Sequence, residues 1–259
     1  MSEDPAAGRV LTRLEDHVAT LTLSRPPHNF VDPAFLEVIA DALDSLDAEP
    51  QCRAVVLVAD GRSFCAGADF SAMNAGGKRP DSSAIYAQAM RLYRTKKPIV
   101  AAIQGAAIGA GVGLALACDF RLASATARFS VNFNRLGFHP GFGLSYTLPR
   151  LIGAGRAARL FYTGERLSAE QALAFGIVDE LVPTEDLRAR AHALAAEIAA
   201  SAPAAVQSTR ATLRAGMAEA IQAANAHELE VQNLEFEMDD FREGVRAAAE
   251  RQTPRFTGT

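Results

Sequence analysis

The chain has 259 residues, with 26 Lys and Arg against 30 Asp and Glu, so its formal net charge is −4, and 49% of its residues are hydrophobic. This length suits one large domain or one domain with a smaller appendage, and the composition excludes a disordered chain. A pI near 5.8 argues against a protein that binds nucleic acid through a broad basic face. A small anionic ligand is still allowed, because it needs only a few local cations.

Cysteine usage and the absence of an apolar leader indicate the compartment. Cys52, Cys65 and Cys118 are widely separated and none lies in a C-x-x-C pair, so neither a disulfide framework nor a metal site is predicted. Residues 1–8 lack the apolar stretch of a secretory signal. The apolar run 99–118 is interrupted by several glycines, which is typical of buried core and not of a membrane span. We therefore expect a soluble, cytoplasmic protein.

The first half of the chain predicts alternating strands and helices. Residues 10–14 and 18–23 carry apolar side chains in the patterns of strands, and 53–59 is almost purely apolar, as in a strand buried on both faces. Asp32 before Pro33 is typical of a helix start. The pattern continues with a helix over 83–95, a strand over 98–103, a glycine-interrupted helix from about 109 and a strand over 120–124. This alternation predicts an α/β fold with right-handed crossovers.

The later part of the chain predicts mainly helices. Ser168 and Gln171 have capping-box spacing, and the chain from 185 to about 250 is almost wholly helical. We therefore divide it into an α/β core, 1–185, and a helical C-terminal segment, 186–259, for assembly and pocket closure. The acidic residues of this segment are interpreted as a solvated helix face; they are Glu228, Glu230, Glu235, Glu237, Asp239 and Asp240.

Two glycine-containing segments, 62–70 and 104–113, each follow a buried-looking strand. Small residues there let the backbone approach a ligand, and a following helix offers unpaired N–H donors. Two such donors would hold an oxyanion, each contributing about 10²–10³-fold in rate. Tight helix–strand packing explains the same glycines equally well. Neither segment is a P-loop, and G-x-G-x-x-G is absent, so a dinucleotide-binding oxidoreductase is disfavoured.

Motifs in a fixed order along nearly the whole chain resemble the crotonase, or enoyl-CoA hydratase/isomerase, superfamily. They are Ser24-Arg25-Pro26 with Asn29, Phe64–Asp69, Pro98–Gly105 with Gly109–Gly111, Ala117–Asp119, Leu136-Gly137 with Pro140-Gly141, Leu151–Gly153, Ala172–Val182, Phe241–Val245 and Pro254–Phe256. The resemblance implies a crotonase-like spiral of β-β-α units with a helical C-terminal segment, assembled as a homotrimer or a dimer of trimers. It also implies an acyl-CoA substrate, with coenzyme A entering as part of that substrate, no tightly bound cofactor, and no nucleic-acid or membrane partner.

The resemblance also places the thioester site on particular residues. The thioester carbonyl oxygen is expected between the backbone N–H groups of Ala68 and Ala110. The residues expected along the coenzyme A groove or at its phosphates are Arg25, Ala66, Asp69, Phe70, Lys97, Arg251 and Arg255. For Arg251 and Arg255, contact across a subunit boundary is one expectation. For any single arginine, solvated surface is the alternative interpretation.

This sequence departs from the family at the two glutamates with which hydratases activate water. Those positions fall at Gly113 and Phe133, and neither residue transfers a proton. General acid–base catalysis contributes about 10²–10⁴-fold, so ordinary hydration and ordinary double-bond migration are not expected. The step is then C–C cleavage, decarboxylation or cyclisation; the alternative is a non-catalytic acyl-CoA-binding relative.

The segment around Phe133 contains polar side chains that could take over the catalytic role of the two glutamates. His139 lies in a loop that resembles the Asp-Gly-Gly-Phe-Gly stretch of dihydroxynaphthoyl-CoA synthases, and an imidazole titrates near pH 6.5. Tyr146 and Asn132 are expected to donate hydrogen bonds to an enolate. A loop histidine that only bonds the backbone is the alternative to a catalytic His139. The phenylalanines between 129 and 142 predict either an apolar acyl pocket or ordinary core.

Overall fold

The computed structural model describes residues 8–70, 73, 79 and 81–259. Within them the strands are β1 (Arg9–Glu15), β2 (Val18–Ser24), β3 (Ala54–Ala59), β4 (Ser63–Cys65), β5 (Ile99–Ile103), β6 (Ala106–Ile108), β7 (Phe120–Ala123), β8 (Arg128–Ser130), β9 (Leu167–Ser168) and β10 (Glu180–Leu181). The helices are α1 (Pro33–Ala48), α3 (Ser82–Leu92), α4 (Ala110–Ala117), the 3₁₀ helix η2 (Asn132–Leu136), α5 (Leu144–Ile152), α6 (Ala154–Thr163), α7 (Ala169–Phe175), α8 (Leu187–Ala199), α9 (Pro203–Leu213), α10 (Met217–Glu235) and α11 (Asp239–Glu250).

The described strands form a six-stranded sheet in the order β1-β2-β3-β5-β7-β10 and a four-stranded sheet in the order β4-β6-β8-β9. In the larger sheet only β1 and β2 pair antiparallel, and the other neighbours are parallel. The alternation of strands and helices along the chain therefore gives the α/β architecture that the sequence predicts.

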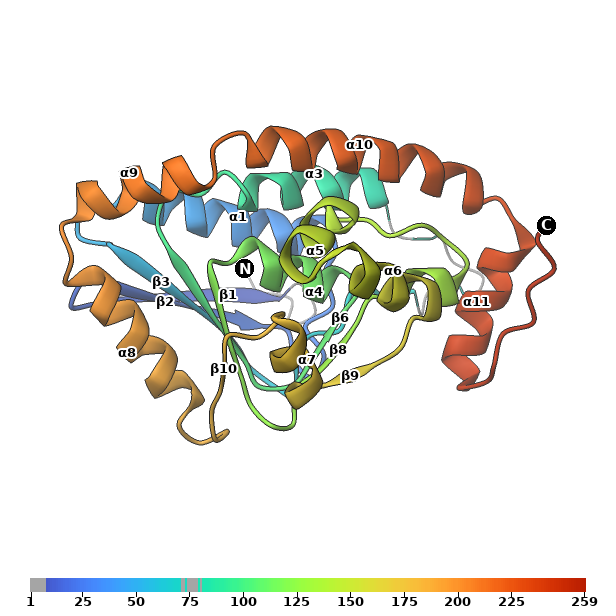
Figure 1. The fold of residues 1–259 in the computed structure, drawn as a ribbon, viewed down its shortest axis with the longest axis horizontal. Coiled ribbons are helices and arrows are strands. Elements are labelled where there is room, and N and C mark those ends of the chain that lie inside the picture. Colours follow the sequence, from blue (N-terminus) through green and yellow to red (C-terminus); the bar gives the residue numbers. More distant parts are fainter. Residues whose placement is uncertain (1–7, 71–72, 74–78, 80) are drawn as a thin grey trace, which may run out of the picture.

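Both faces of the larger sheet are buried, which explains why β3 is apolar at every position. Val55 and Leu57 belong to one core with residues of α1, whereas Val56 and Val58 belong to a second core with residues of α8. Because successive strand residues point to opposite faces, an uninterrupted apolar run fits a strand covered on both sides. Figure 1 shows α1 and α8 on the two sides of these strands.

Two helix starts form as the sequence predicts. Asp32 accepts a hydrogen bond from the N–H of Phe35 at 2.8 Å, and Pro33 occupies the first turn, where its missing N–H has no cost. At α7, the Ser168 hydroxyl accepts from the backbone N–H of Gln171, and the Gln171 side-chain oxygen accepts from the backbone N–H of Ser168, which completes a capping box. Short polar side chains thus satisfy N–H groups that the helix cannot pair.

The helical C-terminal segment covers the molecule from three directions. In Figure 1, α9 and α10 run along the top over α1 and α3, and α11 descends at the end beside the C-terminus. α10 packs on α3 and α5, and α11 packs on η2. None of the helices in the described ranges is long and apolar enough to cross a lipid bilayer. A role of this segment in assembly stays a prediction.

The smaller sheet positions the candidate site. β4, β6 and β8 are parallel neighbours, so their carboxyl ends lie at one edge of the sheet. The loop 66–70 follows β4, the N-terminus of α4 follows β6, and η2 follows β8. Three segments distant in sequence therefore meet at the edge where ligands bind in open α/β sheets.

Candidate active site

Two glycines let the loop after β4 lie directly against the start of α4. Gly67 has a φ of +91°, and a Cβ there would lie 2.9 Å from the carbonyl oxygen of Ile108. A Cβ on Gly111 would lie 2.0 Å from the carbonyl oxygen of Cys65, closer than any side chain permits. The packing explanation and the ligand explanation of these glycines therefore describe the same feature, because the close packing brings two backbone segments together.

The N–H groups of Ala68 and Ala110 are available where these segments meet. Ala110 is the first residue of α4, after Gly109 at the N-cap, so its N–H has no helical acceptor. Val31 bonds the neighbouring Gly67 carbonyl at 2.9 Å. Among the residues that the structure describes, neither alanine N–H donates to a protein acceptor. Both alanines line a cavity of about 90 Å³, and the helix N-terminus carries partial positive charge.

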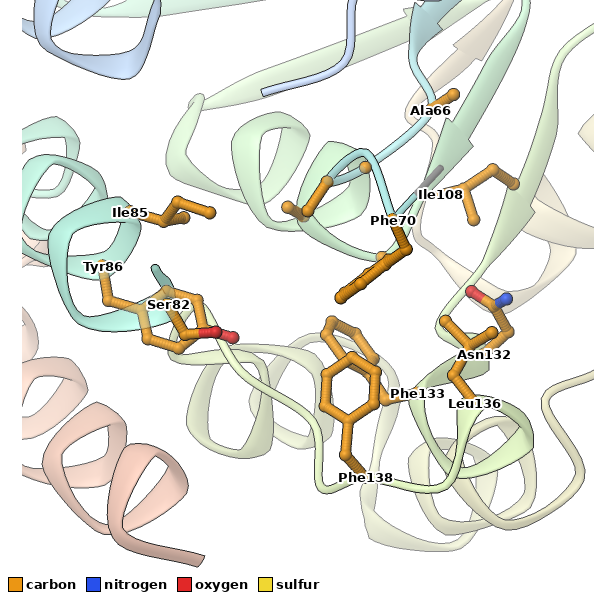
Figure 2. Close-up of a pocket in the computed structure, with 14 residues that line it drawn as sticks. Ala66, Phe70, Ser82, Ile85, Tyr86, Ile108, Asn132, Phe133, Leu136 and Phe138 are labelled. Atoms are coloured by element: carbon orange, nitrogen blue, oxygen red, sulfur yellow. The ribbon is translucent and has the colours of Figure 1, made fainter. Parts of the chain in front are cut away.

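The cavity, called the acyl pocket below, is mostly apolar. Figure 2 shows the rings of Phe70, Phe133 and Phe138 gathered in it, with Asn132 and Leu136 to one side and Ser82, Ile85 and Tyr86 to the other. The loop residues that complete the lining are Ala66, Gly67, Ala68, Ile108, Gly109 and Ala110. The wall of the pocket is therefore formed by backbone where the two loops meet, and by side chains elsewhere.

Three described side chains bring polar groups to the acyl pocket. The hydroxyl of Tyr86 is hydrogen-bonded to Gln232 at 3.0 Å, and burial raises the pKa of Tyr86 well above its ordinary value, so this group stays protonated. Asn132 lines the pocket, and Ser82 lines it from the first turn of α3; a hydrogen bond from Asn132 to an enolate stays a prediction. None of the described lining residues carries a carboxylate or an imidazole.

Phenyl rings lie at or beside Gly113 and Phe133, the two positions that the family resemblance led us to interpret as replaced glutamates. A Cβ on Gly113 would lie 2.4 Å from Cδ1 of Phe142, whose ring is fully buried. Phe133 lines the acyl pocket itself, and its ring reaches 3.6 Å from the place of a Cβ on Gly109. The surroundings of Gly113 thus fit the absence of a side chain there.

The structure does not bring His139 or Tyr146 to the acyl pocket, so the expectation that they act on an enolate is wrong for this arrangement. Since Phe138 points into the pocket, His139 is directed away and lines a separate groove. Its Nδ1 lies 2.7 Å from the carbonyl oxygen of Pro140, which matches the backbone-bonded alternative. Tyr146 lies on α5, outside the pocket lining, with the guanidinium of Arg150 5.0 Å from its ring centroid.

The expectation that Lys97 contacts a coenzyme A phosphate is also wrong. Its side chain is buried, and its ammonium donates to the carbonyl oxygens of Leu46 and of Glu49, the latter at 2.5 Å. These carbonyls belong to the C-terminal end of α1, where a cation stabilises the helix. Lys97 therefore caps the C-terminal end of α1, and its ammonium is not positioned to contact a phosphate.

The other residues expected along a coenzyme A groove lie in several places. Ala66 and Phe70 line the acyl pocket, and Asp69 between them is exposed. Arg25 bonds Asp32 at 2.7 Å. Arg251 and Arg255 are exposed at the end of α11 and on the tail that follows it. Contact of any of these residues with coenzyme A stays a prediction.

Sequence reasoning missed a buried polar seam on α10, formed by Asn225, Glu228 and Gln232. The carboxylate of Glu228 accepts from the N–H of Gly143 at 2.7 Å, and from the N–H and hydroxyl of Ser145 at 2.8 and 2.6 Å. Its side chain is fully buried, so the interpretation of a solvated face is wrong for this residue. The spacing of 3 and 4 residues places all three on one helix face, a signal that the run of acidic residues obscured.

The seam holds the segment that carries Phe138. Gln232 bonds the hydroxyl of Tyr86 and also donates to the carbonyl oxygen of His139 at 2.7 Å. Asn225 donates to Glu228 at 3.1 Å, and that carboxylate lies at the N-terminus of α5, where negative charge is favoured. A helix from the C-terminal segment therefore shapes two walls of the acyl pocket.

The chain is similar to known proteins over nearly its whole length. The profile of the enoyl-CoA hydratase/isomerase family matches residues 13–259. A crotonyl-CoA hydratase of Syntrophomonas wolfei is 32% identical over 95% of this chain and 97% of the relative, and a 1,2-epoxyphenylacetyl-CoA isomerase of Escherichia coli is 34% identical over 96% and 98%. The crystal structure of an enoyl-CoA hydratase/isomerase from Pseudoalteromonas atlantica T6c has a TM-score of 0.87 at 30% identity, covering 96% of this chain and 99% of that one. The expected crotonase-like fold is confirmed.

Proposed function

This chain belongs to the enoyl-CoA hydratase/isomerase family, and we propose that it acts on an acyl-CoA thioester through an enolate held by the N–H groups of Ala68 and Ala110. The observation that carries the proposal is the meeting of two unpaired backbone donors at one end of an apolar pocket. As an enolate forms, negative charge moves onto the thioester oxygen. Donors fixed in position before the reaction stabilise that charge without reorganising.

The proposed reaction is not the addition of water. The described lining of the acyl pocket has no group that activates water by taking a proton, and residues 71–80 contain no Asp, Glu or His. An enolate can instead form when a bond from the α-carbon to a carboxylate breaks, since its electron pair moves into the enolate and CO₂ leaves. Water then protonates the α-carbon. An apolar pocket favours this step, because the carboxylate loses its charge while the charge at the N–H donors grows.

The proposal includes the surroundings of the pocket. Ala66, Asp69 and Phe70 follow the strand that leads to the donors, so we place the pantetheine arm along them. Arg25, Arg251 and Arg255 remain the proposed phosphate contacts. A homotrimer or a dimer of trimers, in the cytoplasm, is the assembly and location that we propose from the family resemblance.

A panel of thioesters tests the function, with malonyl-, methylmalonyl-, acetoacetyl- and crotonyl-CoA supplied to the purified protein. We expect turnover of a substrate that loses CO₂ or cleaves a C–C bond, and little hydration of crotonyl-CoA. Ala110→Pro removes one donor at a first-turn position where proline suits a helix, and should lower kcat about 10²–10³-fold. Ala110→Gly keeps the N–H and is the matched control. Equal activity of the folded proline variant would contradict the oxyanion assignment.

A second candidate is an acyl-CoA-binding protein without catalysis. The observation that favours it is the phenyl ring at Phe133, in place of a proton-transferring group. Calorimetric binding of unreactive acyl-CoA together with no turnover across the panel would select it over the enzyme.

A further inference from the structure

We infer that Phe138 is a specificity-determining residue that limits the length of the acyl group. The inference rests on the proposed function, because it concerns the acyl chain of the thioester held by Ala68 and Ala110. It goes further in naming the substrate class: a thioester of a short acyl group that ends at the ring of Phe138.

Phe138 lies between two cavities and contributes to the lining of both. On one side lies the acyl pocket of about 90 Å³; on the other lies a groove of about 410 Å³, called the outer groove below. Of the residues described, Phe138 is the one that lines both. The other residues of the outer groove are Asn134, Gly137, His139, Pro140, Ser145, Phe161, Tyr162, Glu235, Met238, Asp240 and Phe256. Removing one side chain would therefore join a small pocket to a larger space.

The wall is held rigidly by aromatic packing. The ring of Phe138 has its centroid 5.8 Å from that of Phe70 and 5.4 Å from that of Phe133, both in edge-to-face geometry. On the side of the helical segment, the centroids of Phe236 and Phe241 lie 5.1 and 5.5 Å away. Edge-to-face pairs add about 0.5–1.5 kcal/mol each beyond the area that they bury. Figure 2 shows the ring directed toward Phe70 across the pocket.

The backbone beside the ring is fixed as well. His139 donates its N–H to Glu235 at 2.5 Å, and its carbonyl oxygen accepts from Gln232 at 2.7 Å. The N–H of Phe138 itself donates to the carbonyl oxygen of Phe133 at 3.3 Å. Because both neighbouring peptide groups are bonded, the backbone that carries the ring is held in place, and the rings packed around Phe138 restrict its rotation.

The volume of the acyl pocket then sets the chain length. A dry apolar cavity of about 150 Å³ holds a benzene molecule, and the acyl pocket is smaller. It suits an acyl group of about four carbons or fewer. A longer chain would need the space now filled by the ring of Phe138.

Binding of a saturated, unreactive series tests this inference: acetyl-, butyryl-, hexanoyl- and octanoyl-CoA, measured by titration calorimetry. For the natural sequence we expect octanoyl-CoA to bind about tenfold or more weakly than butyryl-CoA. Phe138→Ala should bind octanoyl-CoA about tenfold or more tightly than the natural sequence does, since each methylene buried in apolar surroundings adds to affinity. Butyryl-CoA should gain nothing.

Phe256→Ala is the matched control, since that ring lines only the outer groove and its loss should leave the order of chain lengths unchanged. Phe138→Leu is the second variant if the alanine protein does not fold, as judged by thermal unfolding, and it should shift the preference in the same direction. The inference is overturned if the natural sequence binds octanoyl-CoA as tightly as butyryl-CoA, or if folded Phe138 variants keep the natural order. No binding of any thioester would instead contradict the proposed function.

Discussion

The two ends of the acyl pocket are built in different ways. At the end where we propose that the thioester binds, called the thioester end below, the available groups are the backbone N–H groups of Ala68 and Ala110, brought together by glycines that admit no Cβ. At the acyl end they are side chains, chiefly Phe133 and Phe138, held by rings and by α10. The first end therefore depends on backbone position, and the second on side-chain identity.

This difference separates reaction chemistry from substrate choice. A backbone donor survives any small substitution at its own position, because the N–H remains. An aromatic wall changes its shape with each substitution, so specificity at the acyl end can change while the donors stay. Four further measurements test whether the two ends differ in this way.

The largest effect is expected at Glu228, which supports the acyl end. Glu228→Ala leaves the N–H groups of Gly143 and Ser145 without their acceptor, and buried donors left unpaired cost about 1–3 kcal/mol each. We expect a loss of about 3–5 kcal/mol in the free energy of unfolding, measured by urea titration. Glu230→Ala, at an exposed position of the same helix, should change it by less than about 0.5 kcal/mol. Similar small losses in the free energy of unfolding for both variants would show that the polar seam does not stabilise the fold.

The thioester end is probed most directly by Gly67→Ala. A Cβ there meets the carbonyl of Ile108 at 2.9 Å, and φ is +91°, so strain of about 1–3 kcal/mol is expected. Because the strain moves the N–H of Ala68, kcat should fall about tenfold or more while KM changes little. Gly155→Ala is the control, since a Cβ at that position has no neighbour within 4 Å. A rise in KM with kcat unchanged would show that Gly67 serves binding and not the reaction.

Alkaline titration tests how well the thiols of Cys65 and Cys118 are shielded from solvent in the folded protein. Burial raises the pKa of Cys65 and of Cys118 to about 12, from an ordinary 9.0. Below pH 9 both the folded and the unfolded chain keep these protons. Between pH 9 and 12 the unfolded chain loses them first, so the free energy of unfolding should fall by about 1.4 kcal/mol per pH unit for each thiol. Urea midpoints would measure this, and Cys118→Ala should remove one thiol's share. An unchanged slope would show that this thiol is not shielded.

The smallest effect is expected at Asn132, a polar side chain where the two ends meet. Its amide lines the acyl pocket, and one neutral hydrogen bond contributes about 0.5–1.5 kcal/mol. Asn132→Ala should therefore lower kcat/KM by about 2–10-fold in steady-state kinetics. Asn134→Ala, exposed on the same short helix, should leave it unchanged. Equal effects would place the contribution in the helix and not in the amide.

Local signals predicted much of the fold correctly. Asp32 and Pro33 start α1, the Ser168 and Gln171 side chains close a capping box, and apolar β3 is buried on both faces. Ala68 and Ala110, which the family resemblance placed together, line one cavity, and their action as oxyanion donors stays a prediction. These features depend on residues near one another in sequence, or on strand order, so pattern and family resemblance suffice.

The predictions that were wrong concern which way a side chain faces. His139 follows Phe138 directly, and only the packing of Phe138 against four other rings decides that the imidazole lies in the outer groove. Lys97 has the charge of a phosphate ligand, but the end of α1 lies beside it. A local sequence pattern does not predict contacts between residues that are about 50 positions apart in the chain.

Residue identity and short-range spacing are sufficient to predict a mildly acidic α/β chain and its two glycine-containing loops. The burial of Glu228 at the start of α5 and the place of Phe138 between two cavities become evident only in the folded structure. Burial and shared walls arise where distant segments pack, and a carboxylate or a phenyl ring acquires its function from what that packing places around it.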